Sequence, residues 1–227
     1  MRLFVILLLL CQPAVAQSRY ELDNSLRDRA KWKSFGVEDW VTGDPIERAR
    51  AGRGRVQTFE LNSIGGDTPV ARLKSLIAVA EAGPKGYDAV HVGGPKKPPK
   101  RPTQMTLREI AAWVKATPGQ PHAIGRYQII PSTMKELIRR SGFSPQTRYS
   151  PQVQDAFADI LLADAGLQKF QKGRISRKRF MNNLARIWAG LPTSNGKSYY
   201  DGYAGNRATI SLAFYRQQMA KFFPRSS

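Results

Sequence analysis

The chain has 227 residues and is strongly basic, with 36 Lys and Arg against 17 Asp and Glu and a formal net charge of +19. One cysteine and two histidines exclude a framework of disulfides within the chain and leave no His/Cys cluster with metal-ligand spacing. Such a charge predicts anionic partners, and it bears on association rather than on fold.

The first sixteen residues have the pattern of a secretory signal peptide. Arg2 gives a positive start, residues 4–10 are apolar, and Ala14-Val15-Ala16 has the form of a cleavage site. The apolar run is too short for a permanent membrane helix. We therefore expect a periplasmic protein that has no stable transmembrane segment after cleavage. A lipid anchor on Cys11 is the alternative, but the leucines before it lack the small residue that usually precedes a lipidated cysteine.

Residues 17–67 form a basic N-terminal extension without a sustained helical or alternating period. Arg alternates with Ala and Gly over residues 49–55, a composition typical of flexible segments. Two interpretations remain open for the extension. It is either a tail that partly docks on the domain behind it or a specific docking arm for a partner protein or the cell wall.

From residue 68 onward the pattern is helical. Apolar residues at positions 73, 76, 77 and 80 share one helical face and predict a helix that ends near Glu81. Thr106 and Glu109 form a capping box, which predicts the start of a second helix. Further helices are predicted from about 132 to 142, from Ser150-Pro151 through residue 167, from Ser176 onward, and from about 206 to 222.

The segment between the first two helices has a different pattern. Residues 87–92 alternate enough to predict a short strand, and a cationic loop follows at residues 95–104. We predict an α+β fold that is predominantly α, with a small β wing after the first helix. Residues 68–227 are long enough to form one domain with a sizeable core.

Glu81 is the candidate catalytic residue. It follows Ile77 by four residues and Leu73 by eight, so helical spacing places its carboxylate on the core-facing stripe at the last turn. Burial and the negative end of the helix dipole both raise a carboxyl pKa there, as a proton donor at neutral pH requires. The alternative is a helix-terminal Glu that points into water.

Asp88 is the weaker catalytic candidate. Its alternative role is a structural hydrogen bond in a turn.

Several motifs in this order resemble the endolysin family of phage lambda. They are Val-Ala-Glu-Ala-Gly at 79–83, Gly-Tyr-Asp-Ala-Val-His-Val-Gly-Gly at 86–94 and Gly-Arg-Tyr-Gln at 125–128. Phe-Ser-Pro at 143–145, the Ser-Pro-Gln-x-Gln-Asp-Ala segment at 150–156 and Ile-Trp-Ala-Gly-Leu-Pro at 187–192 resemble further elements of that family. The resemblance covers residues 72–222.

The resemblance implies a lysozyme-like domain that cleaves the β-1,4 bond between N-acetylmuramic acid and N-acetylglucosamine in peptidoglycan glycan strands. Glu81 matches the family's catalytic acid. Members of the lambda type are lytic transglycosylases, in which the sugar's own 6-hydroxyl attacks and one residue acts as acid and then base, with no cofactor. Ordinary hydrolysis would use a second carboxylate, for which Asp88 is the nearest candidate.

The same resemblance places Gly125-Arg126-Tyr127-Gln128 along the saccharide cleft. There Gln128 can hydrogen-bond sugar substituents, Tyr127 offers a ring face, and Gly125 permits close approach of the backbone. A core position for Tyr127 is the alternative. The remaining predicted substrate contacts are Tyr87, Trp188 and Tyr203, and a core role for Trp188 and an exposed loop role for Tyr203 are their alternatives.

The extension and the signal peptide have no counterpart in a phage lysis protein. We therefore expect a bacterial muramidase, which makes wall gaps for a secretion or flagellar apparatus. A non-catalytic peptidoglycan-binding protein with a lysozyme-like fold is the alternative function. Nucleic acid is a disfavoured partner, because the basic extension supplies only scattered aromatics for stacking and the predicted signal peptide argues for export.

Overall fold

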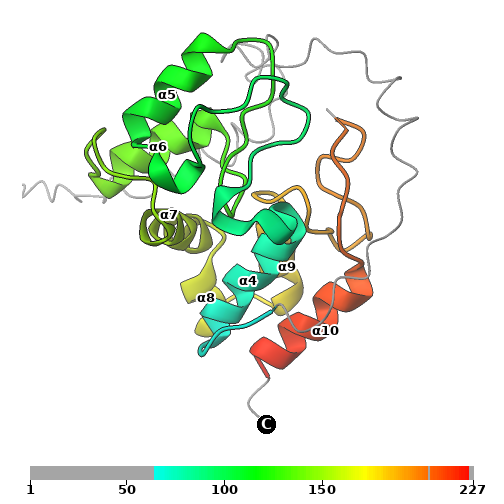
Figure 1. Cartoon of the computed structure of the whole chain (residues 1–227). Helices are drawn as coiled ribbons and strands as arrows, with labels where there is room; N and C mark the ends of the chain where they lie inside the picture. Colours follow the sequence, from blue (N-terminus) through cyan, green and yellow to red (C-terminus); the bar gives the residue numbers. More distant parts are fainter. Residues whose placement is uncertain (1–63, 204, 225–227) are drawn as a thin grey trace, which may run out of the picture. The chain divides into compact units, whose positions relative to one another are not determined.

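The computed structural model describes residues 64–203 and 205–224. Its helices are α4 (Pro69–Glu81), η3 (Gly83–Asp88), η4 (Pro102–Gln104), α5 (Leu107–Ala116), α6 (Pro131–Ser141), α7 (Pro151–Asp164), α8 (Leu167–Gln171), α9 (Arg177–Ala185) and α10 (Leu212–Phe222), where η marks a 3-10 helix (Figure 1). The predicted fold class, predominantly α, is confirmed.

The predicted signal peptide, residues 1–16, lies outside the described residues. So does the predicted extension up to residue 63, and its boundary at residue 67 stays a prediction. Within the described ranges, no helix is both long enough and apolar enough to cross a membrane.

Hydroxyl side chains cap the starts of five helices. Thr68 Oγ1 accepts a hydrogen bond from Ala71 N at 3.1 Å at the start of α4. The predicted capping box is confirmed, because Glu109 N donates to Thr106 Oγ1 and Thr106 N donates to Glu109 Oε2. The Ser150 cap of α7 is confirmed too, and Ser176 and Ser211 cap α9 and α10. These caps satisfy N–H groups that have no partner within the helix.

Two predicted helices have different bounds in the structure. The helix predicted to continue from Ser150 through residue 167 ends at Asp164, because Gly166 adopts a φ of +91° and turns the chain into α8. The last helix begins at Leu212 rather than near residue 206. Its start is delayed because Thr209 N instead donates to Gly190 O at 2.9 Å, outside any helix.

The predicted β wing consists of isolated bridges, so the prediction of a strand over residues 87–92 is wrong in extent. Residues 87 and 88 belong to η3, and the pairing of this segment is the antiparallel bridge of Val90 with Ile124. Ile124 also pairs with Ile129. Gly86 explains the difference, since its φ of +51° turns the chain just before the segment that pairs.

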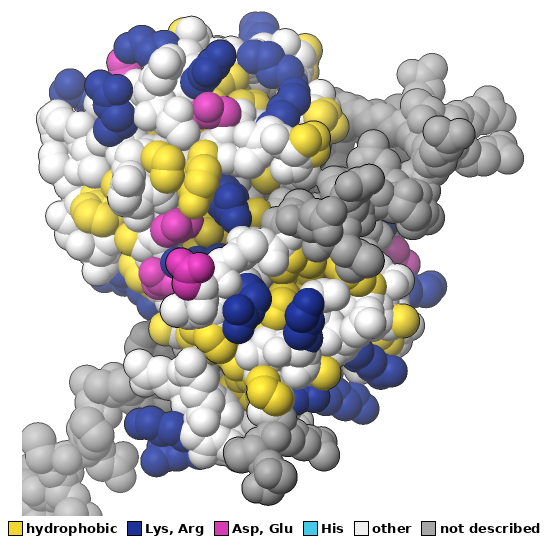
Figure 2. Space-filling view, turned by 60° about the horizontal axis from the view of Figure 1, so that its bottom comes forward, with side chains coloured by type: hydrophobic (Ala, Val, Ile, Leu, Met, Phe, Trp, Pro, Cys, Tyr) yellow, Lys and Arg dark blue, Asp and Glu magenta, His cyan; other side chains and the backbone are white. Residues whose placement is uncertain are grey.

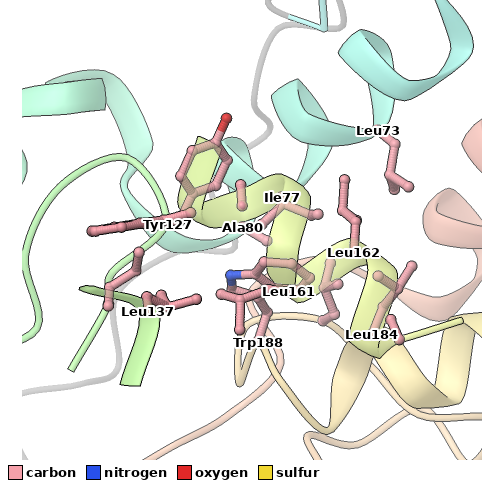
Figure 3. Close-up of a cluster of buried hydrophobic side chains, with 14 of the residues drawn as sticks. Leu73, Ile77, Ala80, Tyr127, Leu137, Leu161, Leu162, Leu184 and Trp188 are labelled. Atoms are coloured by element: carbon pink, nitrogen blue, oxygen red, sulfur yellow. The ribbon is translucent and has the colours of Figure 1, made fainter. Parts of the chain in front are cut away.

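The hydrophobic core surrounds α4. Leu73 and Ile77 on this helix are fully buried, as are Leu162 of α7 and Leu184 of α9, and Trp188 is 2% exposed (Figure 3). Burial of this many large apolar side chains holds α4 firmly against α7, α9 and α10. The C-terminal end of α4, where Glu81 lies, is therefore fixed by the core.

Gln154 on α7 joins four parts of the fold through its buried amide. Its Oε1 accepts from Arg126 N at 2.8 Å, and its Nε2 donates to Tyr87 O at 3.1 Å and to Tyr149 O at 3.0 Å. Gly125 makes this approach possible, because an added Cβ would collide with Gln154 Oε1. The amide thus satisfies three backbone groups that regular structure leaves unpaired.

We expect Gln154→Ala to lower the free energy of unfolding by about 2–4 kcal/mol, because it leaves buried backbone groups without partners. Chemical denaturation monitored by circular dichroism measures the change. Gln152→Ala is the matched control, since Gln152 is exposed on the same helix, and its effect should stay within about 0.5 kcal/mol. Equal stability of the two variants would contradict the role given to Gln154.

Candidate active site

Glu81 is the last residue of α4, and its carboxyl group meets the backbone of a distant segment. Gly190 N donates to Glu81 Oε1 at 2.8 Å. Burial raises the pKa of Glu81 from 4.5 to about 7, and the hydrogen bond from Gly190 opposes this rise. A carboxyl group with this pKa is present in both protonation states near neutral pH, so it can both donate and accept a proton.

Gly190 lies directly against the last turn of α4. A Cβ added to it would collide with Ala80 O, so the approach requires glycine. Thr209 fixes the same region, because its N donates to Gly190 O at 2.9 Å and its Oγ1 donates to Ala80 O at 2.6 Å. These contacts hold the Gly190 N–H in front of Glu81 Oε1.

The hydrogen bond distinguishes the two oxygens of the Glu81 carboxyl group. An oxygen that accepts an N–H is the carbonyl-type oxygen of a neutral carboxyl group, so the acidic proton belongs on Oε2. When Glu81 is ionised, the same N–H stabilises the carboxylate. Residues 64–203 and 205–224 contain no cluster of three or more His, Cys, Asp or Glu that could hold a metal ion at this or any other position.

Asp88 ends η3 and holds the loop that follows. Its Oδ1 accepts a hydrogen bond at 3.0 Å from the backbone N of Thr103, the middle residue of the short helix η4. Asp88 thus has the structural hydrogen bond that was its alternative role. Its role as a second catalytic carboxylate stays a prediction.

Tyr127 is a core residue. It is 2% exposed, and its hydroxyl donates to Asp155 Oδ1 at 2.5 Å. Tyr87 OH contacts both oxygens of Asp155 at 3.1 Å, so one carboxylate binds two phenols. Burial raises the pKa of Tyr127. The prediction that a sugar stacks on the Tyr127 ring is therefore wrong, because the ring is almost completely buried.

The Gly125-Arg126-Tyr127-Gln128 motif is a tight turn between the paired residues Ile124 and Ile129. Gly125 has a φ of +80°, and Gln128 has a φ of +44°, the one positive value among the described non-glycine residues. Gln128 N and Nε2 both donate to Gly125 O, at 3.1 and 2.9 Å. These bonds offset the cost of the left-handed conformation. Gln128 is half-buried, and its contact with substrate stays a prediction.

Arg126 connects this turn to α4 and η3. Its guanidinium carbon lies 4.8 Å from the centroid of the Tyr87 ring, and its Nη2 donates to Ser75 Oγ at 3.1 Å. Arg126 and Tyr87 are both half-buried. The structure thus gives Arg126 and Tyr87 a role in joining elements, and their predicted contacts with substrate stay predictions.

The two remaining predicted contacts have opposite environments. Trp188 is 2% exposed and packs in the core near Leu161 and Leu184 (Figure 3). Its predicted role as a sugar platform is wrong, because the side chain is almost completely buried in the core. Tyr203 is 47% exposed, and its contact with substrate stays a prediction.

A family model described as Endolysin matches residues 77–221. The chain belongs to the endolysin family. Endolysins degrade peptidoglycan, so the family identifies this chain as a cell-wall-degrading enzyme with peptidoglycan as its substrate. The matched range includes Glu81, the 125–128 turn, Gly190 and Thr209. No curated protein and no solved structure matches the chain.

The sequence alone did not indicate Gly190 and Thr209 as residues of the site. Gly190 belongs to the Ile-Trp-Ala-Gly-Leu-Pro motif at 187–192. That glycine was the available signal, since a glycine among larger residues can mark a close backbone approach. Thr209 had no comparable signal, because its role depends on contacts with Gly190 and Ala80 that only the fold creates.

We expect Thr209→Val to raise the pKa of Glu81. Loss of the hydroxyl loosens Gly190, and its N–H lowers this pKa in the folded protein. The acid form then persists to higher pH, and the alkaline limb of kcat/KM on peptidoglycan should move up by about 0.5–1 pH unit. Thr209→Ser keeps the hydroxyl and should keep the limb in place. A fall in kcat/KM that is equal at every pH would indicate a structural effect alone.

Proposed function

We propose that this endolysin is a muramidase that cleaves the β-1,4 bond between N-acetylmuramic acid and N-acetylglucosamine, with Glu81 as general acid and then general base. The observation that carries the proposal is a single carboxyl group at the end of α4, whose pKa is about 7 and whose Oε1 is held by Gly190 N. In the first step the Glu81 proton moves to the glycosidic oxygen while the bond from C1 of the muramic acid to that oxygen breaks.

We favour the lytic transglycosylase route for the second step. The Glu81 carboxylate takes the proton of the C6 hydroxyl while that oxygen forms a bond to C1, which gives a 1,6-anhydro sugar and restores the acid. A hydrolase would instead add water, activated by a carboxylate, and canonical glycosidases supply two such groups. Asp88 is the candidate for that role, but one of its oxygens already binds Thr103 N.

The rest of the proposed function comes from the sequence. The predicted signal peptide supports a periplasmic enzyme, and the basic extension supports a role in opening the wall for a secretion or flagellar apparatus. The alternative is a non-catalytic peptidoglycan-binding protein. The raised pKa of Glu81 favours the enzyme, because burying a carboxylate costs stability that a binding module has no reason to retain.

Digestion of purified sacculi, followed by mass spectrometry of the released muropeptides, tests the proposal. We expect products lighter by one water than hydrolytic products from the wild-type protein and none from Glu81→Gln. Glu136→Gln is the control, since Glu136 pairs with Arg139 on the surface of α6, and it should retain activity.

Two outcomes would contradict the proposal. Products of full hydrolytic mass would replace the transglycosylase route by hydrolysis and direct attention to Asp88. Sacculus binding without any products would favour the wall-binding alternative. In each case, circular dichroism checks that Glu81→Gln is folded.

A further inference from the structure

The C-terminal part of the domain carries most of its net positive charge, because it has almost no acidic residues. Residues 165–224 include eleven Lys and Arg and a single carboxylate, that of Asp201. Neither α9 nor α10 contains any Asp or Glu. Figure 2 shows a similar excess of Lys and Arg over Asp and Glu across one face of the molecule. This part of the protein therefore attracts anions, whatever the net charge of the rest.

A groove with a volume of about 460 Å³ lies between α9 and α10. Met181, Pro192 and Leu212 give it apolar surface, and Arg177, Lys178 and Arg216 give it positive charge. None of the residues that line it is acidic. The groove thus combines an apolar lining with three cations, which suits an anion that also carries small apolar groups.

The cations of the groove differ in how they are held. Arg177 Nη2 donates to Phe223 O at 2.5 Å, so its guanidinium is anchored at the end of α10. Lys178 and Arg216 are exposed, and within the part of the chain that the structure describes neither forms an ion pair. These two side chains can pair with an incoming carboxylate without breaking an existing ion pair.

The groove is connected by short chain segments to the residues that hold Glu81. Ser194 also lines it and follows Gly190 by four residues, and Leu212 follows Thr209 by three. Because a chain extends at most about 3.5 Å per residue, these positions lie within about 14 Å and about 11 Å of Gly190 and Thr209. Asn182 fixes the connection, since its Oδ1 accepts from Ser194 N at 2.8 Å.

We propose that this groove binds the stem peptide of the peptidoglycan strand that is being cut. The stem peptide is attached to the muramic acid, the sugar whose glycosidic bond is cleaved under the proposed function, on which this inference rests. It carries small apolar side chains together with free carboxylates, and four extended residues reach about 13 Å. The methyl groups match the apolar lining, and the carboxylates match Lys178 and Arg216.

Charge alone would also attract phosphate polymers and nucleic acid, but these make no use of an apolar lining. The stem peptide uses both properties of the groove. It also comes from a substrate that is tethered close to Glu81, which raises the local concentration of the peptide. The groove would thus make the enzyme prefer glycan that still carries peptides.

A pair of matched double variants tests the proposal. Lys178→Glu/Arg216→Glu reverses two charges in the groove, whereas Arg179→Glu/Lys221→Glu reverses two charges on the same helices outside it. Each protein is assayed on intact sacculi and on glycan strands from which an amidase has removed the peptides. We expect the groove variant to raise KM on intact sacculi about tenfold, from the loss of two exposed ion pairs and added repulsion. Its kcat, and its activity on stripped strands, should not change.

Equal losses in the two double variants would mean attraction by net charge alone and would overturn the proposal. An equal loss on intact and stripped glycan would overturn it too. Calorimetric titration with a soluble stem tetrapeptide does not depend on catalysis. Binding by the wild-type protein and by the control variant, but not by the groove variant, would support the groove even if neither glycan is cleaved, which would count against the proposed function alone.

Discussion

The hydrogen bond from Gly190 N to Glu81 Oε1 is the contact on which the proposed chemistry depends. Burial alone would favour the neutral carboxyl group, and exposure alone would leave a carboxylate at neutral pH. The N–H opposes the effect of burial, and the resulting pKa is about 7. The donor comes from a residue 109 positions away in the sequence, so the acid exists only when α4 and the 187–192 motif are packed together.

The other motifs that resemble the endolysin family contact one another and α4 through buried and half-buried polar groups. Tyr127 and Tyr87 bind Asp155, Gln154 satisfies the backbone of the 125–128 turn, and Arg126 reaches α4 through Ser75. The motifs at 86–94, 125–128 and 150–156 therefore form a single polar network. Its described contacts are structural, and they join η3, the 125–128 turn and α7 to α4.

Local patterns in the sequence were sufficient for the helix ends that side chains specify. The apolar stripe of α4, the capping box at Thr106 and the cap at Ser150 depend on neighbours a few residues apart, and they could be predicted. Glu81 could be placed at the end of α4 for the same reason. Gly166 was a local signal as well, but the apolar pattern of α7 and α8 obscured the break between them.

The rest of the site depends on contacts that no local pattern encodes. An aromatic residue in a turn motif fits a sugar platform and a core equally well, and the partner that decides for Tyr127 is Asp155, 28 residues later. Thr209 reaches Ala80 across 129 positions. The bridge at Val90 likewise forms because Ile124 is available on the neighbouring segment, and alternation over residues 87–92 could not show where the pairing stops.

A direct titration of Glu81 tests its role as the proton donor. Carbon-13 NMR of the Glu81 carboxyl carbon, assigned by comparison with Glu81→Gln, follows its protonation as the pH changes. We predict an apparent pKa of about 7 for Glu81, raised by burial from the ordinary value of 4.5. A titration midpoint near 4.5 would show a solvated carboxylate and would contradict the role of Glu81 as a proton donor at neutral pH.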